Sequence, residues 1–243
     1  MAETKKQEAA PSFLEDQAGQ GFDNMGSSEI ATPMLLITQP LSQLVQDGKV
    51  KVGHFANSVT GRDYGESIKV IVCHFDKCWV EWKPNGGGFV ARHPVGGVEV
   101  TGDPYTGMKT AEGNNVVETW MYLCVLPDYP EDGFVVFNST RGNLKYLKGW
   151  NTQLKCLRTP GGRPAPLFAA VWEMTLGKDT NKNGQSYYSC NEAGKSSIKM
   201  VGWVEDKIFN EFVVPARSAA TAALADNRVV AQLPEASGEE EAF

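Results

Sequence analysis

The run ESIKVIVCHFDKCWVEWK, residues 66–83, is the longest stretch of alternating side chains in this sequence. In an extended strand, successive side chains point to opposite faces, so Val70 and Val72 fall on one face and Ile71 and Phe75 on the other. Both faces therefore carry apolar groups. This pattern predicts a long, strongly bent strand that is covered on both sides, as the first strand of a barrel can be.

Shorter apolar runs on either side of this strand predict further strands. TPMLLITQ (residues 32–39) and KVKVGHFANS (residues 49–58) indicate an opening hairpin. Glycine-rich residues 84–115 favour mobile hairpin loops that lie outside the core. Residues 116–127 and 133–140 then form a predicted antiparallel pair.

One helix is predicted after these strands. Leu144, Leu147, Trp150, Leu154 and Leu157 recur at steps of three and four, which is the spacing of one helix face. Thr140 is placed to cap its first turn, and the run TPGG from Thr159 ends it.

Three further strands are expected beyond the helix. Residues 167–176 and 185–191 predict a hairpin across the polar turn GKDTNKNG, and another strand starts at Ile198. An amphipathic segment follows around Phe209 and Phe212.

The order of three strands, one helix and two strands is that of an OB-fold. We therefore expect a mainly β (α+β) protein with an OB-fold-like five-stranded barrel, one helix between strands 3 and 4, extra hairpins and disordered termini. The predicted organisation has three parts: a disordered segment at 1–28, an OB-fold-like domain at 29–214 with its loop insert at 84–115, and a flexible tail at 215–243.

Composition narrows the function classes. Apolar residues make up 42% of the 243 residues, yet no run reaches the roughly 18 apolar residues of a membrane span, and the first residues lack the apolar run of a signal peptide. We therefore expect a cytoplasmic protein. The 5 cysteines are an odd number scattered among apolar residues, which is typical of buried free thiols in a reducing compartment.

The net charge of -6 hides a basic centre. Residues 133–200 contain ten Lys and Arg against three Asp and Glu, a net of +7, between acidic flanking segments. The local field, and not the total charge, is what a ligand meets.

Aromatic and basic side chains interleave along the chain, which is the composition that single-stranded nucleic acid requires: rings for exposed bases and cations for phosphates. Each ring can equally be a core residue. The neighbours Tyr187 and Tyr188 point to opposite faces of a strand, so we expect one in the core and the other open to a ligand. The predicted DNA-binding residues are Trp79, Trp82, Lys83, Lys145, Tyr146, Lys148, Trp150, Trp172, Lys178, Lys182, Tyr187, Tyr188, Lys195 and Lys199.

The C-terminus ends in EEEAF, so that Glu239, Glu240 and Glu241 precede a terminal aromatic, Phe243. Such a tip can dock into a basic pocket with an apolar floor on another protein. It can also compete with DNA for a basic groove in its own molecule.

This tail is similar to the acidic, phenylalanine-terminated tails of bacterial and phage single-stranded DNA-binding proteins, and the segment VWEMTLGKDTNKNGQSYYSCN, residues 171–191, resembles the last hairpin of their OB-folds. The resemblance implies a non-enzymatic protein that coats and protects single-stranded DNA during replication, recombination and repair. It also implies that the tail recruits a polymerase, primase-helicase, nuclease or recombinase. The sequence does not decide between a monomer and a homodimer, and no membrane partner is expected.

Other readings have less support in the sequence. Cys73, His74, Cys78, His93 and Cys124 lack the paired CxxC spacing of a zinc site, so neither a metal nor another cofactor is expected. The histidines have no serine elbow or carboxylate motif beside them, so no catalytic residue is predicted. The main alternative is a phage structural β-protein, from the virion or its assembly, without nucleic-acid binding.

Overall fold

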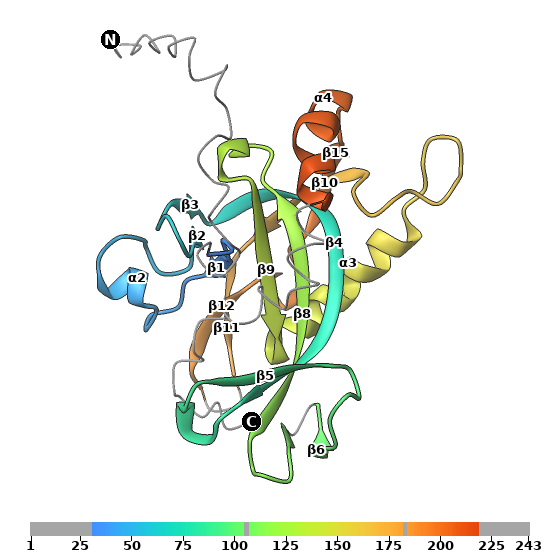
Figure 1. Ribbon diagram of the computed structural model, residues 1–243. Coiled ribbons are helices and arrows are strands. Elements are labelled where there is room, and N and C mark those ends of the chain that lie inside the picture. Colours follow the sequence, from blue (N-terminus) through green and yellow to red (C-terminus); the bar gives the residue numbers. More distant parts are fainter. Residues whose placement is uncertain (1–30, 105–106, 182–183, 219–243) are drawn as a thin grey trace, which may run out of the picture. The chain divides into compact units, whose positions relative to one another are not determined.

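The computed structural model describes residues 31–104, 107–181 and 184–218, apart from the side chains at positions 86 and 141 (Figure 1). The chain divides into two units, residues 1–31 and 32–243. Everything described below belongs to the second unit.

The main element is an antiparallel sheet of eight strands that curls into a half-barrel. Its strands are β4 (Ser67–Trp82), β5 (Phe89–Pro94), β6 (Thr101–Asp103), β7 (Gly107–Lys109), β8 (Asn115–Val125), β9 (Phe134–Thr140), β10 (Ala170–Thr175) and β15 (Lys199–Trp203). The central order is β15-β10-β4-β8-β9; β5 also pairs with β4, and β7 joins β6 to β8. The prediction of a mainly β protein is therefore confirmed.

Three smaller sheets and a few short helices complete the described residues. The sheets are β1 (Leu35–Ile37) with β2 (Phe55–Asn57) and β3 (Asp63–Gly65), β11 (Gly177–Thr180) with β12 (Ser186–Ser189), and β13 (Asn191–Glu192) with β14 (Lys195–Ser196). The helices are α2 (Gln43–Gln46), α3 (Leu144–Cys156) and α4 (Asp206–Ile208), which continues as a π-helix, Phe209–Val213. Single 3-10 turns lie at Pro84–Gly86, Pro130–Asp132 and Arg141–Asn143.

Strand β4 spans almost the whole of the alternating run from which it is predicted. One detail of that prediction is wrong: a bulge between Val72 and His74 shifts the alternation by one residue. Phe75 therefore packs in the same cluster as Val70 and Val72, and not with Ile71.

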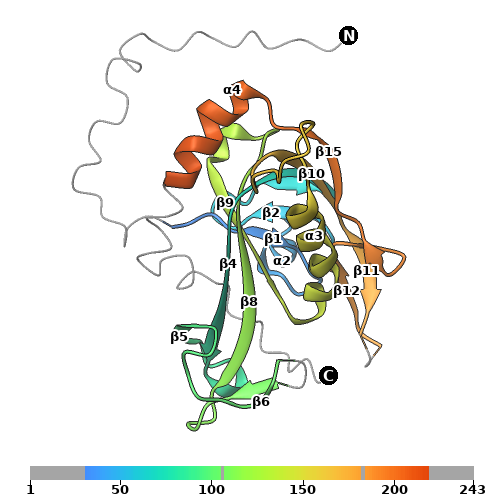
Figure 2. The same cartoon turned by 90° about the vertical axis from the view of Figure 1, so that its right-hand side faces the viewer.

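Two layers cover the sheet. The inner face of β4, β8 and β10 packs against α3 and the β1–β3 sheet, and Tyr122, Trp150 and Trp172 are fully buried there. The outer face carries Ile71 and Cys73, which pack against Val213 of the C-terminal helical segment. Figure 2 shows α3 beside the upper parts of β4 and β8, whose lower parts extend past it to β5 and β6. We call this lower part, residues 76–120, the arm.

Helix α3 lies where the spacing of apolar residues predicts it, but its start differs. A 3-10 turn precedes it, and the N-cap residue is Asn143, whose side chain makes no capping hydrogen bond. The predicted cap, Thr140, is the last residue of β9.

Two sequence predictions about pairing are corrected. The segment 167–176 does not form a hairpin with 185–191, because β12 pairs with β11 and β10 pairs with β4 and β15. The insert at 84–115 is not only loop: it contributes β5, β6 and β7 to the main sheet. Local turn signals reveal where a chain reverses, but not which strand lies beside it.

Four of the cysteines are buried, whereas Cys156 at the end of α3 is exposed. Burial raises the pKa of the Cys73 thiol to about 12. In the described ranges, no helix has the length and apolar character that crossing a membrane requires.

Candidate nucleic-acid interface

Two chain segments that interrupt the central strands carry most of the predicted DNA-binding residues. The first is the arm, which comprises the end of β4, the start of β8 and the residues between them, and the second comprises the hairpins β11–β12 and β13–β14, between β10 and β15. Helix α3 contributes its first turn beside the β11–β12 hairpin, through the contacts described next.

Three predicted residues meet at one carboxylate that the sequence analysis did not select. The hydroxyl groups of Tyr146 and Tyr187 donate hydrogen bonds to Asp179 Oδ2, the second at 2.8 Å, and the Lys145 ammonium lies 3.2 Å from the same oxygen. The backbone N–H of Thr180 donates to Asp179 Oδ1 at 2.8 Å. We call Lys145, Tyr146 and Tyr187 the Asp179 cradle.

The electrostatics of the cradle follow from these contacts. Partial burial disfavours the charged form of Asp179, but the hydrogen bonds from Tyr146, Thr180 and Tyr187 outweigh it, so the pKa of Asp179 is well below its usual range. Burial and the adjacent carboxylate raise the pKa of Tyr187 to about 12. Asp179 is therefore a carboxylate, and the tyrosines are neutral donors, across the physiological range.

The contact of Asp179 with Tyr187 could have been predicted from the sequence, but only with the correct hairpin register. In β11–β12, Asp179 lies directly opposite Tyr187, and Lys178 lies opposite Tyr188. Pairing residues 185–191 with the wrong strand hid this contact.

The expectation that one of the two adjacent tyrosines lies in the core and the other is open is wrong, because both side chains are half-buried. Tyr187 reaches Asp179, whereas the Tyr188 ring lies against Gly53, where an added Cβ would be 2.4 Å from a ring carbon. The backbone of Tyr188 also exchanges two hydrogen bonds with the Gln39 side chain, at 2.8 and 2.9 Å. Neither ring is therefore fully buried in the core, and neither is fully exposed to solvent or a ligand.

Two other predicted lysines line one shallow hollow. Lys178 and Lys199 border a space of about 390 Å³ together with Asn191 and Glu192. The Lys199 ammonium pairs with Glu192 at 3.2 Å. The remaining lining residues are Thr175, Leu176, Gly177 and Ala193.

The arm holds the predicted residues Trp79, Trp82 and Lys83. Trp82 is half-buried and packs edge-on against Phe89 at 6.0 Å between ring centroids. Trp79 is half-buried, and its indole N–H is enclosed without a hydrogen-bond partner. Lys83 is exposed directly after β4.

A buried polar group braces the arm near these rings. Glu81 is only 6% exposed; His93 Nε2 lies 2.7 Å from one of its oxygens, and the Asn114 side chain donates to the other at 2.7 Å. The hydrogen bond from Asn114 lowers the pKa of Glu81; burial opposes this shift, and His93 adds to it. The contacts join β5 and the approach to β8 to the end of β4.

Three predicted base-stacking rings are instead buried, and the first of them, Tyr146, is 4% exposed and reaches Asp179 with its hydroxyl. Trp150 and Trp172 are 0% and 1% exposed, and Trp150 stacks on Tyr122 with ring centroids 4.8 Å apart. A base cannot reach either ring in this conformation, so both are removed from the candidate interface. The apolar helix spacing that predicts α3 already placed Trp150 on its buried face.

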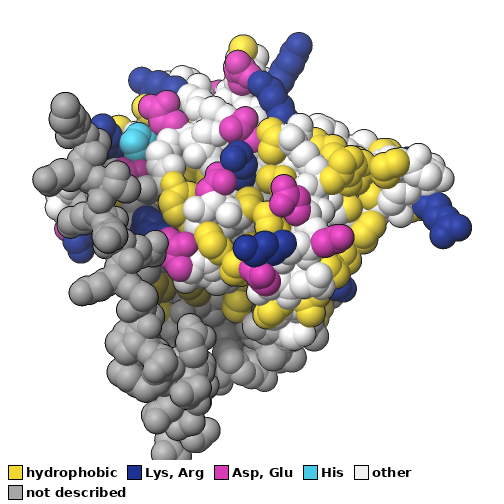
Figure 3. Space-filling view, turned by 90° about the horizontal axis from the view of Figure 1, so that it is seen from above, with side chains coloured by type: hydrophobic (Ala, Val, Ile, Leu, Met, Phe, Trp, Pro, Cys, Tyr) yellow, Lys and Arg dark blue, Asp and Glu magenta, His cyan; other side chains and the backbone are white. Residues whose placement is uncertain are grey.

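The cations are spread out and many are paired. Lys77 lies 3.1 Å from Glu118, and Lys69 lies 3.2 Å from Asp128. On the face seen in Figure 3, Lys and Arg side chains alternate with Asp and Glu and do not form one basic patch. Within the described ranges, Lys83, Lys178 and Lys195 have no ion pair, whereas Lys148 is exposed and has a contact of its own.

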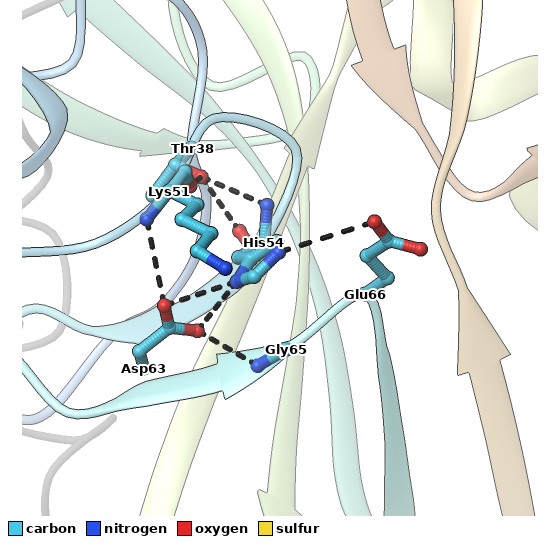
Figure 4. A network of polar contacts seen from close by, with 6 residues as sticks. All are labelled: Thr38, Lys51, His54, Asp63, Gly65 and Glu66. Carbon is cyan, nitrogen blue, oxygen red and sulfur yellow. Dashed lines mark hydrogen bonds and ion pairs between the residues drawn. The ribbon is translucent and has the colours of Figure 1, made fainter.

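A separate polar network surrounds His54 (Figure 4). Its Nδ1 lies 2.8 Å and 3.0 Å from the two oxygens of Asp63, and its Nε2 lies 4.0 Å from Glu66. Burial opposes ionisation of Asp63, but hydrogen bonds from Gly65 and His54 outweigh it and lower its pKa. These contacts join the segment before β2 to β3.

Two groups of predicted residues cannot be placed. Lys182 and the tail residues Glu239, Glu240, Glu241 and Phe243 lie outside the described residues. The described residues contain no group of three or more His, Cys, Asp or Glu side chains that is arranged to hold a metal ion.

The fold and these contacts define a mainly β protein with a curled antiparallel sheet, an aromatic arm and a lysine-bearing hairpin region. Residues 4–214 match the family described as Pam3 phage gp34-like protein, so the chain belongs to that family. Neither the curated proteins nor the solved structures contain a match to this chain.

Proposed function

We propose that this chain is a non-enzymatic, phage-encoded protein that binds single-stranded DNA on an OB-type sheet and coats and protects exposed strands. The family name supports a phage origin. The strand pairing supports the fold: among the five central strands in chain order, the first pairs with the second and fourth, the second with the third, and the fourth with the fifth. An OB-fold uses these pairings, and α3 lies between the third and fourth strands.

The proposal depends on the position of two segments in the strand order: the arm, and the hairpins β11–β12 and β13–β14. OB-folds hold oligonucleotides on strands 2 and 3 and on the loops that join strands 1–2 and 4–5. In this chain residues 83–114 of the arm join the first and second central strands, and the hairpins join the fourth and fifth. Both carry half-buried rings and unpaired lysines, which are the groups for bases and phosphates.

Within the part of the chain that the structure describes, the central sheet does not close into a complete barrel. Strands β9 and β15 lie at opposite ends of the central order, and Met34, before β1, bridges to Val136 of β9. An open sheet of this kind still presents the same two connecting segments. The proposal therefore rests on the pairing order and not on closure.

The test is a binding titration with a labelled single strand and the matching duplex at about 50 and about 200 mM salt. We expect the single strand to bind more tightly and its affinity to fall as salt rises. Affinity that is absent, or equal for duplex and single strand, contradicts the proposal and favours the structural phage protein.

Lysine variants locate the contact. Lys178→Ala and Lys195→Ala should each reduce the slope of log affinity against log salt by about 0.7, because each removes one phosphate contact. Lys207→Ala is the matched control, since this lysine lies on α4, which packs on the outer face of the sheet. Equal effects of all three variants would remove the hairpins from the footprint.

Recruitment of replication, recombination or repair enzymes by the tail remains part of the proposal. Deleting residues 242–243 should abolish partner stimulation and leave single-strand affinity unchanged or higher. A large loss of DNA affinity would contradict that division of roles.

A further inference from the structure

The Asp179 cradle has the composition of an anion site. It directs two phenol hydroxyl groups and one ammonium group at a single oxygen atom. Charge-assisted hydrogen bonds of this kind also bind phosphate oxygens. The atom that now receives them is a carboxylate oxygen of the same chain.

The cradle also lies at the positive end of a helix. Lys145 and Tyr146 are in the first turn of α3, which has 13 residues and no acidic residue in that turn. The side chain of Asn143 makes no capping hydrogen bond. An anion is stabilised near this end of a helix. Asp179 reaches it from another element through the side chains of Lys145 and Tyr146.

We propose that Asp179 is an internal substitute for a phosphate group: the cradle accepts a phosphate of single-stranded DNA when the Asp179 side chain turns away. This inference deepens the proposed function and rests on it. Lys145, Tyr146 and Tyr187 are then phosphate contacts that are held ready, and Asp179 is a competitor that weakens binding.

The exchange needs only a side-chain rotation. The Lys145 side chain is 57% exposed and that of Asp179 is 21% exposed, so an incoming anion can approach from solvent. The hairpin itself stays in place, because Gln39 holds the Tyr188 backbone and Asn191 donates to Gly177 O at 3.0 Å. Tyr146 is 4% exposed, so its hydroxyl is already fixed in position.

A phosphate-binding measurement tests the cradle without DNA. In Asp179→Ala, inorganic phosphate added at constant ionic strength should raise the melting temperature saturably, by about 3 °C, because it fills the vacated site. The wild-type protein and the double variant Lys145→Gln/Asp179→Ala should show no such rise. An Asp179→Ala protein that does not respond to phosphate overturns the proposal.

An oligonucleotide measurement tests the competition. Asp179→Asn keeps the size and an acceptor oxygen but loses the charge, so it should bind a single strand about tenfold more tightly. Its salt slope should be steeper by about 0.7, which corresponds to one added phosphate contact. Unchanged or weaker binding shows that Asp179 only holds the hairpin to α3, and overturns the proposal.

Controls separate this inference from the proposed function. Asp128→Asn loses the same charge from an exposed ion pair with Lys69 and should leave affinity unchanged. If Asp179→Ala does not fold, the oligonucleotide titration of Asp179→Asn alone tests whether Asp179 competes with DNA. If the wild-type protein binds no oligonucleotide, the proposed function fails, and the phosphate response still decides whether the cradle is an anion site.

Discussion

The two ends of β4 belong to one strand but have different surroundings. Residues 68–72 are covered on both faces, by the α3 side of the core and by the C-terminal helical segment. Residues 77–82, in the arm, have an apolar cluster on one face and ion pairs and hydrogen bonds on the other. The comparison teaches that alternation predicts the strand, whereas the layer above each face decides what its side chains do.

The largest expected effect is in the covered end. Trp150→Ala removes a ring with no exposed surface from the layer over the first half of β4, so it should lower the free energy of unfolding by about 3–5 kcal/mol. Urea denaturation measures this. The matched change in the arm, Trp79→Ala, should cost clearly less, because that ring is half-buried. Equal losses would mean that the arm is as tightly packed as the core.

The next effect concerns the buried carboxylate of the arm. Glu81→Ala leaves His93 and Asn114 without their acceptor and should cost about 2 kcal/mol in urea denaturation. The pKa of Glu81 is lower in the folded than in the unfolded state. Its stabilising contribution is therefore fully present above the ordinary glutamate pKa and is lost as the pH falls from there through the lower pKa of the folded state.

A pH series checks that sign. Between about pH 5 and about pH 3, the wild-type protein should lose more stability than Glu81→Gln, which has no carboxyl to protonate. Parallel pH profiles for the two proteins would show that Glu81 is not stabilised as the charged form.

Hydrogen exchange compares the two ends directly, with a smaller expected difference. Buried amides of residues 68–72 should exchange only through global unfolding, whereas those of residues 77–82 should open locally at a free energy about 1–2 kcal/mol lower. Native-state exchange in low denaturant measures both. Identical opening energies would make β4 one cooperative unit.

The smallest stability effect is expected at the end of the arm. Lys83→Ala changes an exposed side chain with no described ion pair, so the free energy of unfolding should change by less than about 0.5 kcal/mol. If the arm contacts DNA as proposed, the salt slope should still fall by about 0.7. An unchanged slope would exclude Lys83 from the interface.

Much of the secondary structure could be predicted because its signals are local. The run 66–83 and the spacing of Leu144, Leu147 and Trp150 specify a strand and a helix by their own periods. The bulge after Val72 was missed, since one additional unpaired residue leaves no mark in the composition. The partner of β12 was also missed, because turn residues do not identify the neighbouring strand.

The candidate site was predictable residue by residue but not as an arrangement. Lys145, Tyr146 and Tyr187 were each selected for their chemistry, yet their meeting at Asp179 joins a helix to a hairpin more than thirty residues away. Trp172 was selected for the same reason and is buried. An aromatic residue has the same letter in a core and on a binding surface, so composition cannot separate the two.

By itself, the sequence determined a mainly β chain with one substantial helix, a basic central segment and an acidic, phenylalanine-terminated end, because periodicity and charge are read from neighbouring residues. The tertiary structure decided which rings are enclosed, which lysines are already paired and which carboxylate occupies the cradle at α3. Those properties depend on contacts between distant segments, and only the packed sheet with its covering layers determines them.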